Sequence, residues 1–198
     1  TVDTTPPAIS ITYPTSNSVK NNYIINGTST DTNLNYTNIS IKQGATIINS
    51  TTTTSSSWEV SLYVPDGVYN ITATAYDKAG NSNSTTVTNV TIDATPPTTT
   101  ASAVKDDGSS YTFNTWTNST YVNVTLNCTN SDCDITKYCL DTVNNCTPNL
   151  TYSAPVQIST EGISYIRYRS NDTLGNLETT NSRTIKIDTT LPVLNFTS

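Results

Sequence analysis

Residues 66–81 read Asp-Gly-Val-Tyr-Asn-Ile-Thr-Ala-Thr-Ala-Tyr-Asp-Lys-Ala-Gly-Asn. In this run Ile71, Ala73 and Ala75 alternate with polar residues, which is the period of a β-strand that buries one face. Asp-Gly precedes the alternation, and the turn-forming residues 77–81 follow it. The stretch therefore predicts a half-buried strand that runs into the turn of a hairpin.

The same pattern returns 95 residues later, in residues 161–176. A short phrase, Ile-Asp-Ala-Thr-Pro-Pro at 92–97, also returns as Ile-Asp-Thr-Thr-Leu-Pro at 187–192, and an earlier copy, Val-Asp-Thr-Thr-Pro-Pro, occupies 2–7. Repeats of this length predict separate modules in tandem. The copies at 2–7 and 92–97 are 90 residues apart, whereas those at 92–97 and 187–192 are 95 residues apart. The second module therefore has a net insertion of five residues, which we expect in its cysteine-containing region.

These phrases divide the chain into three parts. We predict one module over 1–93, a second with the cysteine-containing insertion over 94–188, and the first strand of a further repeat over 189–198. Residues 192–197 resemble 7–12, so the last segment would start a third module if the natural polypeptide continues. If it does not, the strand could complete the sandwich of a neighbouring subunit by β-augmentation.

Further alternating runs lie at 9–13, 58–62 and 122–126, and no segment has a helical stripe of apolar residues. Short strands with turn residues between them, in units of 90 to 95 residues, are typical of an antiparallel β-sandwich. We therefore predict an all-β fold with two tandem sandwiches.

Residues 66–81 and their repeat resemble the last hairpin of prokaryotic immunoglobulin-like repeats. The Asp-Thr-Thr-Pro-Pro phrases resemble the linkers that join such repeats in bacterial and archaeal surface proteins. The resemblance implies two tandem immunoglobulin-like antiparallel β-sandwiches in an extracellular, cell-surface array, and it implies no particular ligand.

Composition limits the partners of the chain. Charged residues make up only 12%, and the net charge of −6 comes without any basic run. Nucleic acid is therefore not an expected partner. No apolar stretch reaches the roughly 20 residues that cross a bilayer, so we expect no membrane insertion within this segment and place any export signal or anchor outside it.

Asn-x-Ser/Thr sequons are the most abundant motif. About eight would be expected from the content of Asn, Ser and Thr, whereas the chain has fourteen, and all but one end in Thr. We predict N-glycosylation at Asn26, Asn35, Asn38, Asn49, Asn70, Asn83, Asn89, Asn118, Asn123, Asn127, Asn145, Asn149, Asn171 and Asn195. The alternative is that Asn and Thr simply occupy polar faces and turns.

The strand period supports glycosylation at several of these sites. Residues i and i+2 share one face of a strand, so the sequons of Asn38, Asn70, Asn89 and Asn123 place Asn and hydroxyl outward and the apolar middle residue inward. By the two-residue period, Asn35 would face inward if it belonged to the strand that follows. We therefore expect Asn35 to precede this strand.

Four cysteines lie within nineteen residues, with no His in the chain. The spacing lacks the C-x2-C of a zinc knuckle, so disulfides are favoured over a metal site. Three pairings are possible. Cys128 continues an inward-facing alternation, whereas Cys139 has the opposite parity to Tyr138 and Leu140, which we expect on the core side. We therefore predict the disulfides Cys128–Cys133 and Cys139–Cys146.

Catalytic residues are scarce. Without His the commonest general base is missing, and the close carboxylate pairs, Asp106 with Asp107 and Asp132 with Asp134, lie in turn-like surroundings. We predict no enzymatic activity and no cofactor.

Calcium is the remaining metal to consider. Asp77, Asp93, Asp172 and Asp188 lie in turns or linkers and are candidate ligands, although no EF-hand pattern or dense acidic run is present. The alternative is that these residues, like Asp3, only form Asx-type turns.

The two tryptophans, Trp58 and Trp116, raise the possibility of a surface on which sugars stack. Trp58 alternates with apolar residues and is expected in the core, whereas Trp116 has no clear place.

The expected function is structural. The chain would be an N-glycosylated module of an extracellular filament, stalk or adhesin, with other copies or repeats of itself and covalent N-glycans as partners. The alternative is a ligand-binding or carbohydrate-binding domain of an adhesin or secreted protein.

Overall fold

The computed structural model describes residues 2–194 and divides the chain into two units, Thr1–Thr95 and Pro96–Ser198, each of which is described by itself. The described residues form sixteen strands and no helix. They accordingly contain no helix long and apolar enough to span a membrane. The predicted all-β class is confirmed.

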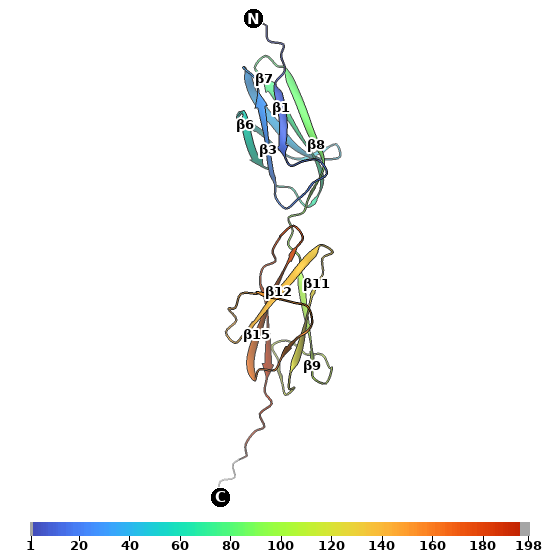
Figure 1. Cartoon of the computed structure of the whole chain (residues 1–198), viewed down its shortest axis with the longest axis vertical. Helices are drawn as coiled ribbons and strands as arrows, with labels where there is room; N and C mark the ends of the chain where they lie inside the picture. Colours follow the sequence, from blue (N-terminus) through green and yellow to red (C-terminus); the bar gives the residue numbers. More distant parts are fainter. Residues whose placement is uncertain (1, 195–198) are drawn as a thin grey trace. The chain divides into compact units, whose positions relative to one another are not determined.

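The described residues of the first unit form eight strands. They are β1 (Ala8–Tyr13), β2 (Val19–Lys20), β3 (Ile24–Thr30), β4 (Leu34–Gln43), β5 (Thr46–Thr53), β6 (Ser57–Ser61), β7 (Gly67–Asp77) and β8 (Ser82–Ile92). Figure 1 labels β1, β3, β6, β7 and β8 among them. One sheet has the order β1-β3-β6 and the other the order β2-β8-β7-β4-β5. All pairs are antiparallel except β2 with β8.

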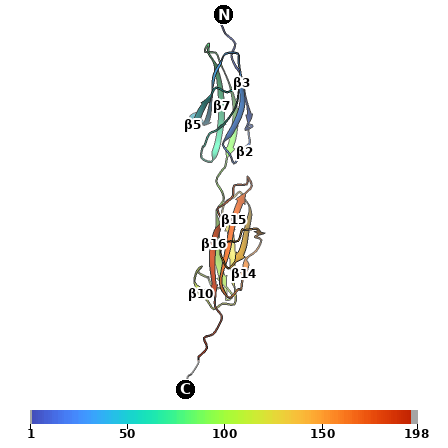
Figure 2. The ribbon, with the colours of Figure 1, turned by 90° about the vertical axis from the view of Figure 1, so that its left-hand side faces the viewer.

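The second unit repeats this plan. Its strands are β9 (Thr99–Lys105), β10 (Trp116–Thr117), β11 (Val122–Cys128), β12 (Cys133–Asp141), β13 (Leu150–Thr151), β14 (Val156–Ile158), β15 (Gly162–Asp172) and β16 (Asn181–Ile187). The sheet orders are β9-β11-β14 and β10-β16-β15-β12-β13, with β10 parallel to β16. Figure 2 shows β10, β15 and β16 of this second sheet from the side.

The extra residues of the second unit do not lie where we expected them. The connection between the first and third strands is 14–23 in the first unit and 106–121 in the second, which is ten residues against sixteen. In the cysteine-containing region the connection after β12 is longer than that after β4 (142–149 against 44–45), but β13 is shorter than β5, so β11 and β14 start 34 residues apart against 33 for β3 and β6. The insertion therefore precedes the cysteine-containing region.

The hairpin predicted from residues 66–81 is present as β7 and β8. Ile71, Ala73 and Ala75 are all buried, as their alternation predicts. In the connecting turn Gly80 has a φ of 94°, a left-handed conformation that glycine adopts without steric cost. The equivalent turn of the second unit has Gly175 at a φ of 86°.

Each unit has its own hydrophobic core between its two sheets. In the first unit it includes Ile25, Ile39, Trp58, Ile71 and Val90, so the predicted core position of Trp58 is confirmed. The Trp58 indole Nε1 donates to Ser29 Oγ at 3.0 Å, and Thr37 Oγ1 donates to the same oxygen at 2.7 Å. This bonding satisfies the buried polar atoms of the indole and of Thr37 inside the core.

The core of the second unit includes Val122, Val124, Ile166, Tyr168 and Ile185. Beside it lies a buried carboxylate that joins the first strand of the unit to the turn between β15 and β16.

Glu178 provides this carboxylate. Its two oxygens accept bonds from Thr99 N at 2.8 Å, Thr99 Oγ1 at 2.6 Å, Ser170 N at 3.0 Å and Asn181 Nδ2 at 2.8 Å. Four donors of this kind satisfy a buried carboxylate.

The predicted strand at the end of the chain is only partly described. Leu191 to Leu194 are exposed and belong to no strand. The rest of that segment, with the Asn195 sequon, lies outside the described residues.

Candidate functional site

Thirteen of the predicted glycosylation sites fall within the described residues, and none of their Asn side chains is fully buried. Exposed are Asn35, Asn38, Asn83, Asn89, Asn118, Asn127, Asn145 and Asn149. Half-buried are Asn26, Asn49, Asn70, Asn123 and Asn171. Most acceptor side chains thus lie at the surface of the two units, whereas the Asn26 side-chain oxygen is buried.

The strand sequons separate the acceptor from the core. In the sequons of Asn38, Asn70, Asn89 and Asn123 the middle residues, Ile39, Ile71, Val90 and Val124, are all buried. A glycan on any of these four asparagines would therefore extend away from the core on the opposite face of its strand.

Asn35 corrects one expectation. It lies inside β4 and does not precede it. The pairing of β4 with β7 shifts between Leu34 and Tyr36, which is a β-bulge. A bulge resets the alternation of side chains, so Asn35 is exposed although its parity conflicts with Ile39.

The hydroxyl of a sequon is not always free. Thr37, the third residue of the Asn35 sequon, is buried and bonded to Ser29. Ser40 of the Asn38 sequon is also buried and donates to Thr72 O at 3.4 Å, so the prediction of an outward hydroxyl is wrong for this sequon. Some acceptor amides are also engaged: Asn49 Nδ2 donates to Tyr63 O at 2.9 Å, and Asn83 Nδ2 donates to Pro7 O at 3.1 Å. Because an amide nitrogen carries two hydrogens, one remains for substitution in each case.

Both predicted disulfides are present. The Cα atoms are 6.3 Å apart in Cys128–Cys133 and 6.2 Å apart in Cys139–Cys146, within the usual range for disulfides. One detail of the parity argument is wrong, because Leu140 is 42% exposed and Cys139 only 5%. Of the two residues placed on the core side, only Tyr138 packs against the core.

The structure gathers Asp3, Asp31 and Asp77 of the first unit, whose carboxylate oxygens lie within 4.8 Å of one another. We call these three residues the acidic cluster. Asp77 was predicted as a candidate ligand, whereas Asp31 was missed, because only the fold brings its turn to the linker and to the β7–β8 turn. Three carboxylates at this distance form a possible set of oxygen ligands for a hard cation such as calcium.

Hydrogen-bond donors already serve the acidic cluster. Asn81 donates from its backbone N to Asp77 Oδ1 at 2.8 Å and from Nδ2 to Asp77 Oδ2 at 2.7 Å. Asn33 Nδ2 donates to Asp3 Oδ2 at 3.0 Å, and Asn33 N to Asp31 Oδ1 at 2.7 Å. Burial of Asp77 opposes its ionisation, but the bonds from Asn81, together with those from the backbone of Gly80 and Ala79, outweigh it and hold the pKa of the carboxyl below its usual range.

Of the other predicted aspartates, Asp172 and Asp188 accept hydrogen bonds in turns. Asp172 is 1% exposed and accepts bonds from Leu174 N, Asn176 N and Asn176 Nδ2, as Asp77 does from Asn81. Asp188 accepts from Thr190 N at 3.0 Å, which is the predicted Asx turn. The backbone N of Asp93 donates to Lys20 O at 2.9 Å.

Three of the carboxylates considered for catalysis also accept hydrogen bonds. Asp106 accepts from Thr120 N and Thr120 Oγ1, and Asp107 accepts from Ser109 N and Ser109 Oγ. These bonds lower the pKa of both carboxyl groups, so each is suited to remain an anion. Asp134 accepts a bond from Asn171 Nδ2 at 3.3 Å.

Trp116 lies in β10 and is 57% exposed, with Lys186 Nζ 6.0 Å from its ring centroid. Trp58 is buried in the other unit, so the two tryptophans do not form one sugar-stacking surface. The remaining exposed aromatic side chains include Tyr63, which packs with Tyr23 at a centroid distance of 4.9 Å.

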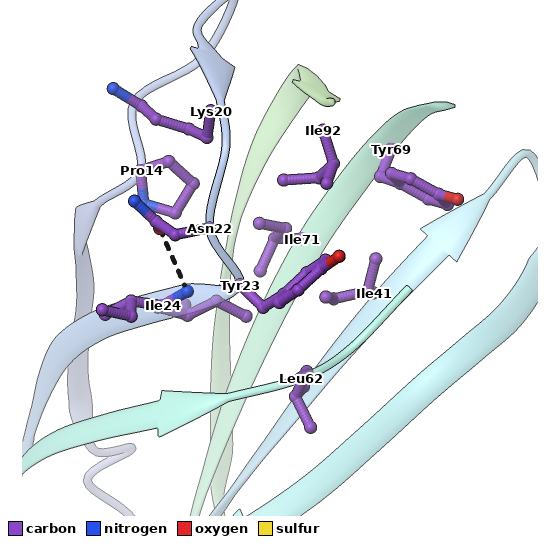
Figure 3. A pocket seen from close by; sticks show the side chains of 11 residues that line it. Pro14, Lys20, Asn22, Tyr23, Ile24, Ile41, Leu62, Tyr69, Ile71 and Ile92 are labelled. Carbon is purple, nitrogen blue, oxygen red and sulfur yellow. Dashed lines mark hydrogen bonds between the residues drawn. The ribbon is translucent and has the colours of Figure 1, made fainter. Parts of the chain in front are cut away.

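A small cavity lies at the end of the first core, lined by Tyr23, Ile41, Leu62 and Ile71 among others (Figure 3). Its volume is about 10 Å³, which holds at most one water molecule and no organic ligand. Figure 3 shows Ile41, Leu62 and Ile71 around the Tyr23 ring. The cavity is therefore a packing gap and not a binding site.

The chain is similar to one protein family and to two solved structures. Residues 15–94 match the family of bacterial Ig-like domains. A search of curated proteins gave no match. Among solved structures, the fibronectin(III)-like modules of Clostridium thermocellum CbhA align with 96% of this chain and 100% of theirs, at 16% identity and a TM-score of 0.38. A 1.5-MDa bacterial ice-binding adhesin aligns with 94% of this chain over 67% of that chain, at 16% identity and a TM-score of 0.41. The first unit of the chain is thus similar to bacterial Ig-like domains over residues 15–94, and the second unit repeats its order of strands.

Proposed function

We propose that this chain is a structural, N-glycosylated module of an extracellular filament, stalk or adhesin on a bacterial or archaeal cell surface. The observation that carries the proposal is the separation of the strand sequons from the core. Four strands present an asparagine at the surface directly before a buried apolar residue. Glycans on these strands are compatible with folding of both units.

The disulfides support an extracellular location. Cys128–Cys133 and Cys139–Cys146 are of a kind that persists in oxidising compartments. The low content of charged residues, 12%, fits a surface whose solubility comes from polar neutral groups and attached sugar.

Other copies or repeats of the same chain are the proposed partners, joined through proline-containing linkers that restrict bending. Strand donation by residues 189–198 is one proposed route of assembly. Each described unit already has its own first strand, β1 or β9, so that position is filled. A donated strand would therefore have to pair with the edge of a sheet or be accepted by a neighbouring unit.

The experiment is an intact-mass measurement on native material, followed by peptide mapping of the sequons. We expect a mass above the 21.3 kDa of the bare segment, with sugar on several of the thirteen described sites. A mass equal to the bare polypeptide would reject glycosylation.

The second candidate function is binding of a ligand or carbohydrate. Trp116 is the observation that favours it, because an exposed tryptophan provides a stacking face. A glycan array with the two-unit protein separates the candidates, since a structural module should bind no glycan specifically and a binding module should lose its binding on Trp116→Ala.

A further inference from the structure

Two of the four cysteines are the middle residues of sequons. These tripeptides are Asn127-Cys128-Thr129 and Asn145-Cys146-Thr147. Each contributes one sulfur to a different disulfide, Cys128–Cys133 or Cys139–Cys146. In each of these two tripeptides of the second unit, disulfide formation and glycosylation thus act on neighbouring residues of the same tripeptide.

The first tripeptide is held by hydrogen bonds at the end of β11. Thr129 N and Thr129 Oγ1 both donate to Thr98 O, at 3.0 and 3.1 Å, and Thr100 Oγ1 donates to Asn127 O at 3.2 Å. An enzyme that requires a hydroxyl two residues after the asparagine must contact both groups at once. The bond from Thr129 Oγ1 to Thr98 must therefore open before that contact is made.

The second tripeptide is held by a carboxylate and a guanidinium. Asp141 Oδ2 accepts bonds from Asn145 N at 2.7 Å and from Cys146 N at 2.8 Å. Arg167 Nη1 donates to Cys146 O at 2.7 Å. The backbone of this tripeptide is consequently occupied on both sides, although the Asn145 side chain is exposed.

Local opening would release either tripeptide if hydrogen bonds were its only restraints. The disulfides add a covalent restraint, because their cysteines are only five and seven residues apart. Closing loops of this length lowers the population of open conformers on the order of 40-fold in the chain-entropy treatment.

The two reactions balance separately. Glycosylation forms a bond from Asn Nδ2 to the anomeric carbon of a phosphate-activated sugar, breaks the bond from that carbon to phosphate, and releases one amide proton. Disulfide closure joins two sulfurs, releases two protons and passes two electrons to a disulfide-type oxidant, which becomes a dithiol. Neither reaction consumes the other's atoms, so they compete only through the conformation of the shared tripeptide.

We propose that disulfide closure limits glycosylation at Asn127 and Asn145, so that each site is modified only while its cysteine is still a thiol. The inference rests on the proposed N-glycosylation. It makes the oxidation state of the second unit a regulator of its sugar content, site by site.

The test uses variants that open one disulfide and leave both sequons intact. Cys139→Ser frees Cys146, and Cys133→Ser frees Cys128. Occupancy of each sequon is measured by peptide mapping of the protein secreted from its glycosylating host. Asn38, in the first unit, is the matched control because its sequon contains no cysteine.

We expect Cys139→Ser to raise occupancy at Asn145 at least about twofold without changing Asn127, and Cys133→Ser to do the reverse. Occupancy at Asn38 should stay constant in both variants. The inference is overturned if Asn127 and Asn145 are fully occupied in the natural protein, or if neither responds to its own disulfide. Absence of sugar from every sequon, including Asn38, would instead reject the proposed function and the inference together.

Discussion

Gly27 is the position where one added carbon should cost most. It lies in β3, opposite Ile11 of β1 and Trp58 of β6. A Cβ atom at this position would overlap the Trp58 ring and the carbonyl oxygen of Ser10. The change Gly27→Ala also keeps the Asn26 sequon, so it perturbs packing and leaves the glycosylation motif unchanged.

The expected loss of stability follows from these contacts. Overpacking a closely packed core costs about 1–3 kcal/mol. Displacing the indole also breaks its buried bond to Ser29 Oγ, worth about 1 kcal/mol. We therefore expect Gly27→Ala to lower the free energy of unfolding of the first unit by about 2–4 kcal/mol, which is a fall in its Tm of about 10–25 °C.

Trp58 provides the assay. It is the buried tryptophan of the first unit, whereas Trp116 belongs to the second unit and is exposed, so the blue-shifted part of the fluorescence reports unfolding of the first unit. Calorimetry of the same protein gives the second transition as an internal reference. Gly44→Ala is the control: that turn has a φ of +59° and no atom within 4 Å of the added carbon. The control should lose only about 1 kcal/mol from backbone strain.

The reasoning would be refuted by a loss below about 0.5 kcal/mol for Gly27→Ala, since β1 or the indole would then move aside without cost. Equal losses for Gly27→Ala and Gly44→Ala would also refute it.

Four further predictions test other parts of the molecule. The pKa of Asp77 is lower in the folded than in the unfolded protein, so this carboxylate stabilises the first unit above the unfolded carboxyl pKa of about 4, and the stabilisation is lost as the pH falls toward the folded pKa. Asp77→Asn should therefore flatten the acid side of a plot of Tm against pH. Removing one disulfide by Cys139→Ser with Cys146→Ser should cost the second unit about 2.5 kcal/mol in guanidinium unfolding, and an unchanged midpoint would contradict the loop-closure argument. Glu178→Ala should lower the free energy of unfolding, measured by urea denaturation, by about 3 kcal/mol, because it leaves buried donors unpaired. A loss under about 1 kcal/mol would mean that water replaces the carboxylate. Chelation should leave the Tm of the first unit unchanged, because amide donors already serve the acidic cluster; a fall restored by calcium would assign a metal site there.

Local patterns in the sequence were sufficient for much of the fold. The alternation in residues 66–81 predicted the strand that buries Ile71, Ala73 and Ala75, and the turn residues 77–81 predicted its end. Strand period and turn chemistry depend on neighbours a few residues apart, so they can be read without knowing the partners of a strand. The disulfide pairing was predicted from the parity of Cys128 and Cys139 and is present, although Leu140 does not lie on the core side as that argument assumed.

Features that depend on contacts between distant residues were decided only by the tertiary structure. The bulge that exposes Asn35 exists in the pairing of β4 with β7, and the meeting of Asp3, Asp31 and Asp77 requires three separate segments. The exposure of Leu140 likewise depends on what covers each face of β12. By itself the sequence determined the repeat, the all-β class and the outward asparagines of the strand sequons, because period and turns are local. The tertiary structure decided register, bulges and clusters, because these are properties of pairs of segments that no local pattern encodes.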